Sequence, residues 1–331
     1  MTYLILRYSS LGNVAMMVPL IASLSENYPD DQFIVVCHKR LEDLFYGMDN
    51  VKIVAFEGLK QIRDNKHLYL LLKKQYKIDV VIDLQDIFHT HLLRFLFRMS
   101  GAKVVSVQPN RIHKLLLCLR GATKSSILKP EVERYRDAFI KAGLKTDNTF
   151  RSLKINEAAR ETIIKQFGKN EGRWIGIAPF AKHKTNTMPY QIMKELIERL
   201  TKNNNTQVFL FGAGEVECEM LRQWASIYKK TESVAGTLSM SEELELMRQL
   251  DVMICMDSAN QHLASLVGLR TISIWCGTHK SAGFSAWKQN EKDIIERNLS
   301  CRPCTIHGKE RCKFGNFLCK QISAEEIIKK I

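Results

Sequence analysis

Polar residues that could bind an anion follow the first apolar run of the chain. The run YLIL is followed by R-Y-S-S-L-G-N, in which Ser10 and Gly12 predict a tight turn from a strand into a helix. The backbone N–H groups at the start of a helix have no partners within it, so such a turn can hold a phosphate. Asn13 is either part of this site or an ordinary cap of the helix.

A second candidate loop follows the apolar run WIGIAP and is rich in cations and hydroxyl groups. Its polar residues are Lys182, His183, Lys184, Thr185, Asn186 and Thr187. Ammonium and hydroxyl groups donate hydrogen bonds to phosphate oxygens, so this composition is suited to a diphosphate. The alternative is a basic loop that is only solvated.

The segment F-G-A-G-E-V-E only partly matches a dinucleotide-binding motif. It lacks the third glycine of G-x-G-x-x-G and follows an internal strand, so we interpret Gly212 and Gly214 as residues of a tight turn. Glu215 or Glu217 is then placed to accept hydrogen bonds from ribose hydroxyl groups.

The segment C-M-D-S-A-N-Q-H leaves an apolar run and enters a helix directly. Either Asp257 or Ser258 is expected at the N-cap, with His262 about one turn further along. The free N–H groups and the positive end of the helix dipole favour an anion there. His262 either serves this site or is a core histidine whose hydrogen bonds are satisfied.

Strands and helices that position these loops alternate in two series. The first runs from YLIL to VVSVQ, residues 108–150 show helical segments without a clear strand, and the second runs from WIGIAP to TISIW. This alternation predicts an α/β fold with parallel, doubly wound sheets that bind ligands at the carboxyl ends of their strands. We expect domains at residues 1–155 and 156–331. The terminal segment ISAEEIIKKI predicts a Ser-capped helix that can pack back on the N-terminal domain.

The composition argues against several classes of protein. A chain with 45% hydrophobic and 25% charged residues is expected to fold, and its apolar runs are shorter than the roughly 18 residues of a membrane span. The start MTYLILRYSS does not have the pattern of a signal peptide, so a cytoplasmic location is expected. The net charge of +14 favours polyanionic partners, but no zinc-finger, RNP-like or basic-zipper motif points to nucleic acid.

Taken in order, these segments resemble glycosyltransferase family 9, the ADP-heptose:lipopolysaccharide heptosyltransferases. The matching stretches are RYSSLGNVAMMVP, GIAPFAKHK, FGAGE, DSANQHLA, IWCGTH and CRPC. The resemblance spans nearly the whole chain. It implies a GT-B fold of two facing Rossmann-like domains, with the acceptor bound mainly by the N-terminal domain and the nucleotide sugar by the C-terminal one. It also implies inverting, metal-independent transfer that requires no cofactor.

With this resemblance, the loops can be assigned to donor and acceptor. The expected donor-binding residues are Ser10, Gly12, Lys182, Lys184, Thr185, Asn186, Glu215, Asp257, Ser258, Ala259, His262 and Thr278. The expected acceptor-binding residues are Gln85, Asp86, His89, Arg111, Lys114 and Arg120, and the alternative for the last three is a solvated basic helix. The implied donor is an ADP-sugar. The implied acceptor is lipopolysaccharide or another phosphorylated envelope glycolipid, met by peripheral contact with the inner face of the cytoplasmic membrane.

Asn13 occupies the position at which the family has its catalytic base, an aspartate that follows L-G. An amide oxygen is too weakly basic to take a proton from the acceptor hydroxyl near neutral pH. Three explanations are open: another residue is the base, the protein binds nucleotide sugars without transferring them, or the aspartate was replaced by engineering. Asn186 also stands where the family has lysine, and Ala259 where it has glycine. A nucleotide-sugar epimerase or hydrolase is a further alternative.

Four of the nine cysteines are concentrated near the C-terminus. Cys301, Cys304, Cys312 and Cys319 form the pattern C-x2-C-x7-C-x6-C. Thiolates at this spacing predict either a structural zinc site or cysteines that are reduced or disulfide-linked. In each case their role would be to fix an irregular loop, and not to catalyse.

Overall fold

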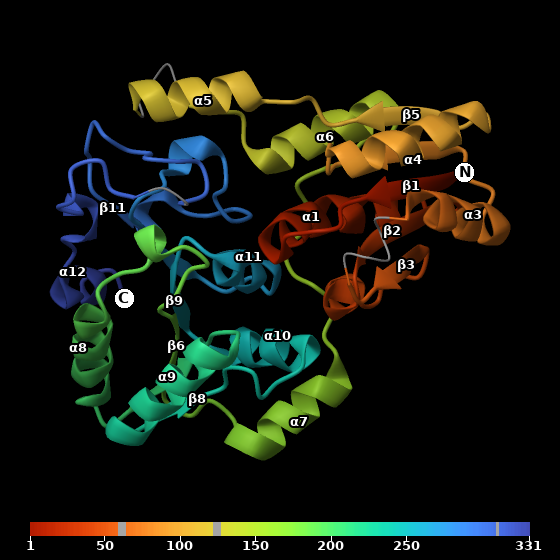
Figure 1. Ribbon diagram of the computed structural model, residues 1–331. Coiled ribbons are helices and arrows are strands. Elements are labelled where there is room, and N and C mark those ends of the chain that lie inside the picture. Colours follow the sequence, from red (N-terminus) through yellow and green to blue (C-terminus); the bar gives the residue numbers. More distant parts are fainter. Residues whose placement is uncertain (59–63, 122–126, 309–310) are drawn as a thin grey trace. The chain divides into compact units, whose positions relative to one another are not determined.

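The computed structural model describes residues 1–58, 64–121, 127–308 and 311–331, and the chain divides into two compact units. The first unit comprises Met1–Asn110 and Lys129–Lys154. The second comprises Arg111–Leu128 and Ile155–Ile331. Each unit has a sheet with helices on both faces (Figure 1).

The described part of the first unit contains a five-stranded parallel sheet in the order β3-β2-β1-β4-β5. The strands are β1 (Thr2–Leu6), β2 (Gln32–His38), β3 (Val51–Phe56), β4 (Val80–Asp83) and β5 (Lys103–Ser106). The central strands are buried on both faces, which is why they read as continuous apolar runs in the sequence.

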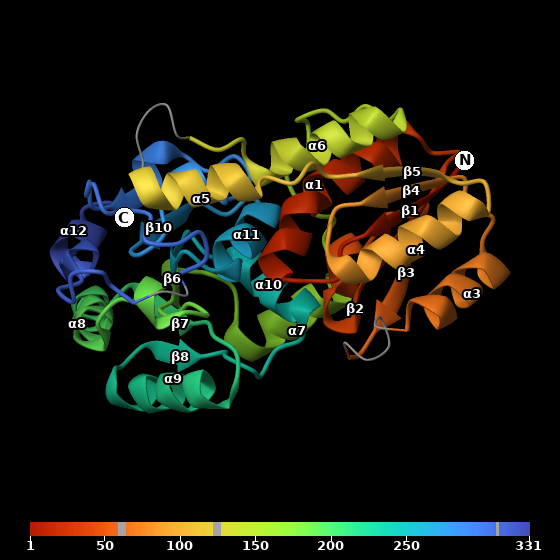
Figure 2. The ribbon, with the colours of Figure 1, turned by 45° about the horizontal axis from the view of Figure 1, so that its top comes forward.

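Helices cover both faces of this first sheet. They are α1 (Leu11–Asn27), the 3₁₀ turn η1 (Lys39–Phe45), α3 (Asn65–Gln75), α4 (Phe88–Met99) and α6 (Glu131–Ala142). α3 and α4 pack on one face, where Leu72, Leu93 and Phe97 join the strand residues in one core. α1 and α6 cover the other face (Figure 2). A long helix was predicted from Leu59, but its start lies outside the described residues. Only α3 can be compared with that prediction, and it is helical as expected.

The second unit has a six-stranded parallel sheet in the order β11-β10-β9-β6-β7-β8, counted over its described residues. The strands are β6 (Arg173–Ala178), β7 (Thr206–Leu210), β8 (Thr231–Ser233), β9 (Val252–Met256), β10 (Thr271–Trp275) and β11 (Ile294–Glu296). Because all strands are parallel, the loops after β6, β7, β9 and β10 leave the sheet at the same edge.

Helices of the second unit also lie on both faces of its sheet. They are α5 (Arg111–Arg120), α7 (Glu157–Phe167), α8 (Tyr190–Thr201), α9 (Glu215–Ile227), α10 (Met240–Gln249), α11 (Ala259–Leu266) and α12 (Ala324–Ile328). Short 3₁₀ turns are η3 (Lys184–Asn186), η4 (Lys280–Ala282), η5 (Glu291–Asp293) and η6 (Leu318–Lys320). α8, α9 and α12 contribute to one hydrophobic core with the strands.

The predicted α/β class with two parallel sheets is confirmed, but two segments lie elsewhere than expected. Residues 111–128, expected in the first domain, group with the second unit, where Leu117 packs against Leu128 and Ala282. The terminal helix α12 is capped by Ser323, as predicted, and packs in the core of the second unit, whereas packing back on the N-terminal domain was expected. None of the described helices is long and apolar enough to cross a membrane.

Candidate functional site

Two loops meet at the carboxyl edge of the first sheet, because β1 and β4 are neighbours. Arg7, directly after β1, is buried, and its Nη1 donates hydrogen bonds to the carbonyl of Leu84 at 3.0 Å and to Oε1 of Gln85 at 3.2 Å. Arg7 therefore joins the first loop to the segment after β4. It was missing from the sequence-based site, although a cation immediately after an apolar strand is a signal that could have found it.

Asn13 lies in the first turn of α1. The helix begins at Leu11 with Ser10 as its N-cap, so Gly12 is inside the helix and not in a turn before it. The Nδ2 group of Asn13 donates a hydrogen bond to Ser10 Oγ at 3.2 Å. The alternative that Asn13 caps the helix is thus wrong. A carboxylate at this position would lie near the positive end of the α1 dipole.

Three acceptor candidates share the segment after β4. Asp83 is buried at the end of the strand, and its carboxylate accepts hydrogen bonds from the backbone N–H groups of Gln85 at 2.9 Å and Asp86 at 3.0 Å. Asp86 has a left-handed backbone with φ of 45° and forms an ion pair with Arg94 at 3.2 Å. His89 is exposed in the first turn of α4. The structure brings these candidates to one edge, next to the loop that contains Asn13.

The other three acceptor candidates lie on α5 in the second unit. Arg111 and Arg120 are exposed at its two ends, and Lys114 Nζ lies 5.3 Å from the ring centroid of Phe284. The predicted acceptor set is therefore divided between the units.

At the carboxyl edge of the second sheet, three segments meet at Asp257. Thr278, after β10, donates its hydroxyl to Oδ2 of Asp257 at 2.6 Å. Gln261, on α11, donates Nε2 to Oδ1 at 3.0 Å, and Asn186, after β6, places Nδ2 at 3.5 Å from Oδ2. Gln261 was not among the sequence-based predictions, although four residues after Asp257 it is one helical turn away.

The two titratable groups of this cluster have opposite pKa shifts that share one cause. Burial raises the pKa of Asp257 to about 6, although the hydrogen bonds from Thr278 and Gln261 oppose the change. Burial lowers the pKa of His262 to about 4, because a low-dielectric environment disfavours any charged form. His262 is therefore neutral at physiological pH.

Four buried polar atoms beside Asp257 have no hydrogen-bond partner within the described residues. They are Asn186 Oδ1, Ser258 Oγ, Gln261 Oε1 and His262 Nδ1. Ser258 is the N-cap of α11, but its side chain makes no capping hydrogen bond. The unpartnered Nδ1 of His262 favours a role in this site over the alternative of a satisfied core histidine. Buried polar atoms are nearly always paired, so four together at a helix N-terminus indicate a site for a polar or anionic ligand that also uses the backbone at Ala259.

The basic loop after β6 is tied to its neighbours through Thr185. The Thr185 hydroxyl donates to the carbonyl of Gly308, and its own carbonyl accepts the N–H of Gly277 at 3.3 Å. Lys182 and Lys184 are exposed. The two lysines, and not Thr185, are the side chains of this loop available for a phosphate.

The two glutamates considered for binding ribose, both after β7, differ in exposure and in hydrogen bonding. Glu217 is half-buried and its Oε2 accepts the N–H of Ala213 at 3.2 Å. Glu215 is exposed as the first residue of α9. This leaves Glu215 as the ribose candidate at the same sheet edge as Asp257.

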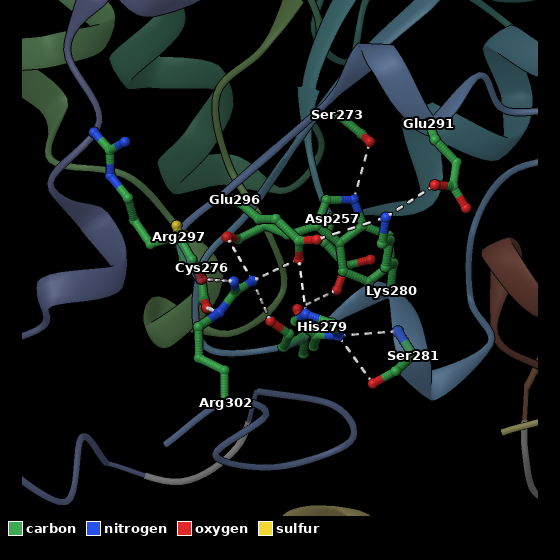
Figure 3. Close-up of polar contacts among 12 residues, drawn as sticks. Asp257, Ser273, Cys276, His279, Lys280, Ser281, Glu291, Glu296, Arg297 and Arg302 are labelled. Atoms are coloured by element: carbon green, nitrogen blue, oxygen red, sulfur yellow. Dashed lines mark hydrogen bonds and ion pairs between the residues drawn. The ribbon is translucent and has the colours of Figure 1, made fainter. Parts of the chain in front are cut away.

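A buried arginine holds the loop that carries Thr278 (Figure 3). Arg302 is fully buried and donates to the carbonyls of Trp275 at 2.9 Å, Cys276 at 2.6 Å and Thr278 at 2.7 Å, and also to that of Arg297. Glu296 lies 3.3 Å from its guanidinium. Arg302 was missed from sequence, because nothing local to C-R-P-C shows that these carbonyls surround it.

The four C-terminal cysteines line one pocket together with Thr185 and Gly277. All nine cysteines are free. Among the described residues, no group of three or more His, Cys, Asp or Glu side chains is arranged to hold a metal. Within the described residues these cysteines are not linked by disulfides, and a structural zinc site stays a prediction.

Two parallel α/β units, one with a polar ligand site at a strand edge and a helix N-terminus, have the architecture of GT-B glycosyltransferases. The model of glycosyltransferase family 9 (heptosyltransferase) matches residues 68–315. The chain belongs to this family, and the predictions of the family and of a glycosyltransferase are confirmed.

Known relatives match over nearly the whole chain. Lipooligosaccharide heptosyltransferase 2 of Campylobacter jejuni is 22% identical, over 97% of this chain and 95% of that protein. The solved structure of ADP-heptose LPS heptosyltransferase II from E. coli is similar with a TM-score of 0.72 and 17% identity, covering 100% of this chain and 97% of the other. A family 9 glycosyltransferase from Veillonella parvula is similar with a TM-score of 0.77 and 16% identity, covering 99% and 95%.

Proposed function

We propose that the protein is an inverting glycosyltransferase that moves a heptose or a related sugar from an ADP-sugar to lipopolysaccharide or another envelope glycan. The relatives support both substrates: the E. coli protein is named for ADP-heptose, and the C. jejuni protein for lipooligosaccharide. The proposal includes a cytoplasmic location, peripheral contact with the inner membrane, metal-independent transfer and no nucleic-acid partner.

The group of unpartnered buried atoms beside Asp257 carries this proposal. In a donor complex, the N–H groups at the start of α11 and the hydroxyl of Ser258 would bind the diphosphate, with Lys182 and Lys184 adding positive charge. The neutral His262 would donate or accept a hydrogen bond without adding charge. Glu215 would accept from the ribose. Stabilising the departing diphosphate in this way lowers the barrier to transfer.

The first unit would hold the acceptor, with Gln85, Asp86 and His89 at its sheet edge. Asn13 cannot accept the proton of the attacking hydroxyl. Asp86 is a carboxylate after β4, the strand next to the one that leads to Asn13, and is the first candidate for a replacement base. The rival is a protein that binds the donor without transferring sugar.

Calorimetric titration with ADP-heptose, ADP and UDP-sugars tests the donor site. We expect selective binding of the ADP compounds that is weakened about tenfold or more in Ser258→Ala, because one hydrogen bond to a charged group is lost. Gln223→Ala on the exposed face of α9 is the control and should bind like the wild type. No binding of any nucleotide sugar would refute the proposal.

A transfer assay on truncated lipopolysaccharide separates the enzyme from its rival. In a wild type without a base, Asn13→Asp should raise the turnover number by roughly 10²-fold, the usual contribution of a general base, whereas a base supplied by Asp86 would make the gain much smaller. Donor affinity should not change. Unaltered, negligible transfer by a variant that still binds ADP-heptose would favour the binding protein.

A further inference from the structure

We infer that the outer face of α3 and α4 is the surface by which this protein docks on an anionic lipid bilayer. This inference rests on the proposed function, because it concerns how a lipid-anchored acceptor reaches the first unit. The surface consists of Leu70, Phe88, Leu92, Phe95 and Met99, with the cations that flank them on the two helices.

Helix α4 is apolar on two sides. Its inward residues Leu93 and Phe97 are buried in the core of the first unit. Its outward residues are separated by four, three and four positions, so they form a second stripe along the helix. These outward residues are Phe88, Leu92, Phe95 and Met99, exposed by 84%, 50%, 55% and 72%. The core does not need this second stripe, and a contiguous exposed apolar surface is typical of an interaction site.

Helix α3 extends the same surface. It packs beside α4, with the rings of Tyr69 and Phe97 5.0 Å apart, and it exposes Leu70 by 54%. The apolar surface therefore continues over two helices.

The charges on the two helices themselves have one sign. Neither helix contains an Asp or Glu. The cationic residues are Lys66, Lys73, Lys74, Arg94 and Arg98, and His67, His89 and His91 are the histidines. Arg94 is paired with Asp83 and Asp86, whereas the three lysines and Arg98 are exposed. Apolar side chains flanked by exposed cations match the headgroup and upper acyl region of an anionic membrane, where each nearby cation strengthens the attraction.

The length and place of α4 fit docking in the plane of the interface. Its 12 residues extend about 18 Å, less than the roughly 30 Å of a bilayer core. It starts directly after the segment with Gln85 and Asp86. A bilayer that contacts α4 therefore meets the same edge of the sheet that is proposed to bind the acceptor.

Co-sedimentation of the full-length protein with vesicles tests this surface. We expect binding to vesicles of phosphatidylglycerol and phosphatidylethanolamine, and at least about tenfold weaker binding to phosphatidylcholine alone. The double variant Leu92→Glu/Phe95→Glu should bind anionic vesicles at least about tenfold less tightly, because it replaces apolar contacts with like charge. Val216→Glu/Ile227→Glu, on the exposed side of α9, is the matched control and should bind like the wild type.

A second variant isolates the charge. Lys73→Glu/Lys74→Glu should weaken binding and reduce its dependence on salt between about 0.1 and about 0.5 M. Equal vesicle binding by the wild type and the Leu92/Phe95 variant, or no binding by the wild type, would overturn the inference. A dimer in light scattering that only this variant disrupts would assign the surface to a second copy instead.

Failure of the surface and failure of the proposed function give different results. The Leu92/Phe95 variant should keep its melting temperature and its affinity for ADP-heptose, because both side chains point to solvent. Loss of vesicle binding with retained donor binding supports the surface. Absence of donor binding in the wild type would refute the proposed function. Vesicle binding is measured independently, so it would still show whether this surface contacts the membrane.

Discussion

Asp257 and His262 show how one environment acts differently on an acid and a base. Asp257 directly precedes the N-cap of α11 and His262 lies on that helix, and burial moves both toward their neutral forms. A neutral histidine and a carboxyl that titrates near neutrality are suited to a site that must receive a doubly charged diphosphate, since neither adds a fixed negative charge at mildly acidic pH. Their hydrogen-bonding capacity is then available for the ligand.

The raised pKa of Asp257 predicts a pH-dependent contribution to stability. A carboxyl whose pKa rises from 3.8 to about 6 on folding stabilises the protein below its unfolded pKa, and this contribution is lost as the pH rises through the folded value. Relative to Asp257→Asn, the wild type should lose up to about 3 kcal/mol of unfolding free energy between about pH 4 and about pH 7. Urea unfolding of both proteins at several pH values measures this. A difference that does not vary with pH would contradict it.

At the scale of elements, the irregular segment after β11 acts as a brace for the loop after β10. Arg302 satisfies carbonyls of that loop, the N–H of Cys304 donates to the carbonyl of Gly277 at 2.9 Å, and Lys320 Nζ donates to the carbonyl of Lys184 at 2.8 Å. The same segment thus supports both the loop that carries Thr278 and the basic loop. The cysteine-rich stretch therefore has a structural role as the support of these two loops.

Replacing Arg302 should weaken both the fold and the donor site. Arg302→Met leaves several buried carbonyls and Glu296 without their cation, so we expect a loss of about 3–5 kcal/mol in unfolding free energy. Lys280→Met removes a more exposed partner of Glu296 and should cost only about 0.5 kcal/mol. Chemical unfolding and ADP titration measure the two effects. Equal stability of the two variants would show that Arg302 does not brace the loop.

In the whole molecule, the two units are not formed by two consecutive stretches of the chain, because a segment of the second unit interrupts the first. Residues 111–128 pack on the second unit, and Lys129–Lys154 then returns to the first. Two consecutive halves are therefore not two independent folding units. A fragment that ends near residue 155 would expose the apolar side of α5.

The packing of α5 predicts unequal effects of two similar substitutions. Leu117 is fully buried against Leu128 and Ala282, so Leu117→Ala should lower the unfolding free energy by about 2–3 kcal/mol. Leu119, two residues further, is 67% exposed, and Leu119→Ala should change it by about 0.5 kcal/mol or less. Thermal and urea unfolding of the two variants provide the measurement. A larger loss for Leu119 would place α5 in a different orientation.

The fold class, the family and the order of the ligand loops could be predicted from the amino-acid sequence. Strand and helix periodicities are local, and buried parallel strands read directly as apolar runs between helices. The polar segments after YLIL, WIGIAP and VMICM were visible for the same reason, and Asp257, Ser258 and His262 lie at a helix start as their spacing predicted.

Tertiary structure alone decided which of these residues meet and which unit each segment joins. Asp257 is 71 residues from Asn186 and 21 from Thr278, and Arg302 binds carbonyls 24 to 27 residues away as well as nearer ones. Such contacts depend on the order of strands in the sheet and on the path of irregular loops. Neither the strand order nor the loop path produces a periodic pattern in the sequence. The contacts of Arg302 and the packing of α5 in the second unit are therefore seen only in the three-dimensional structure.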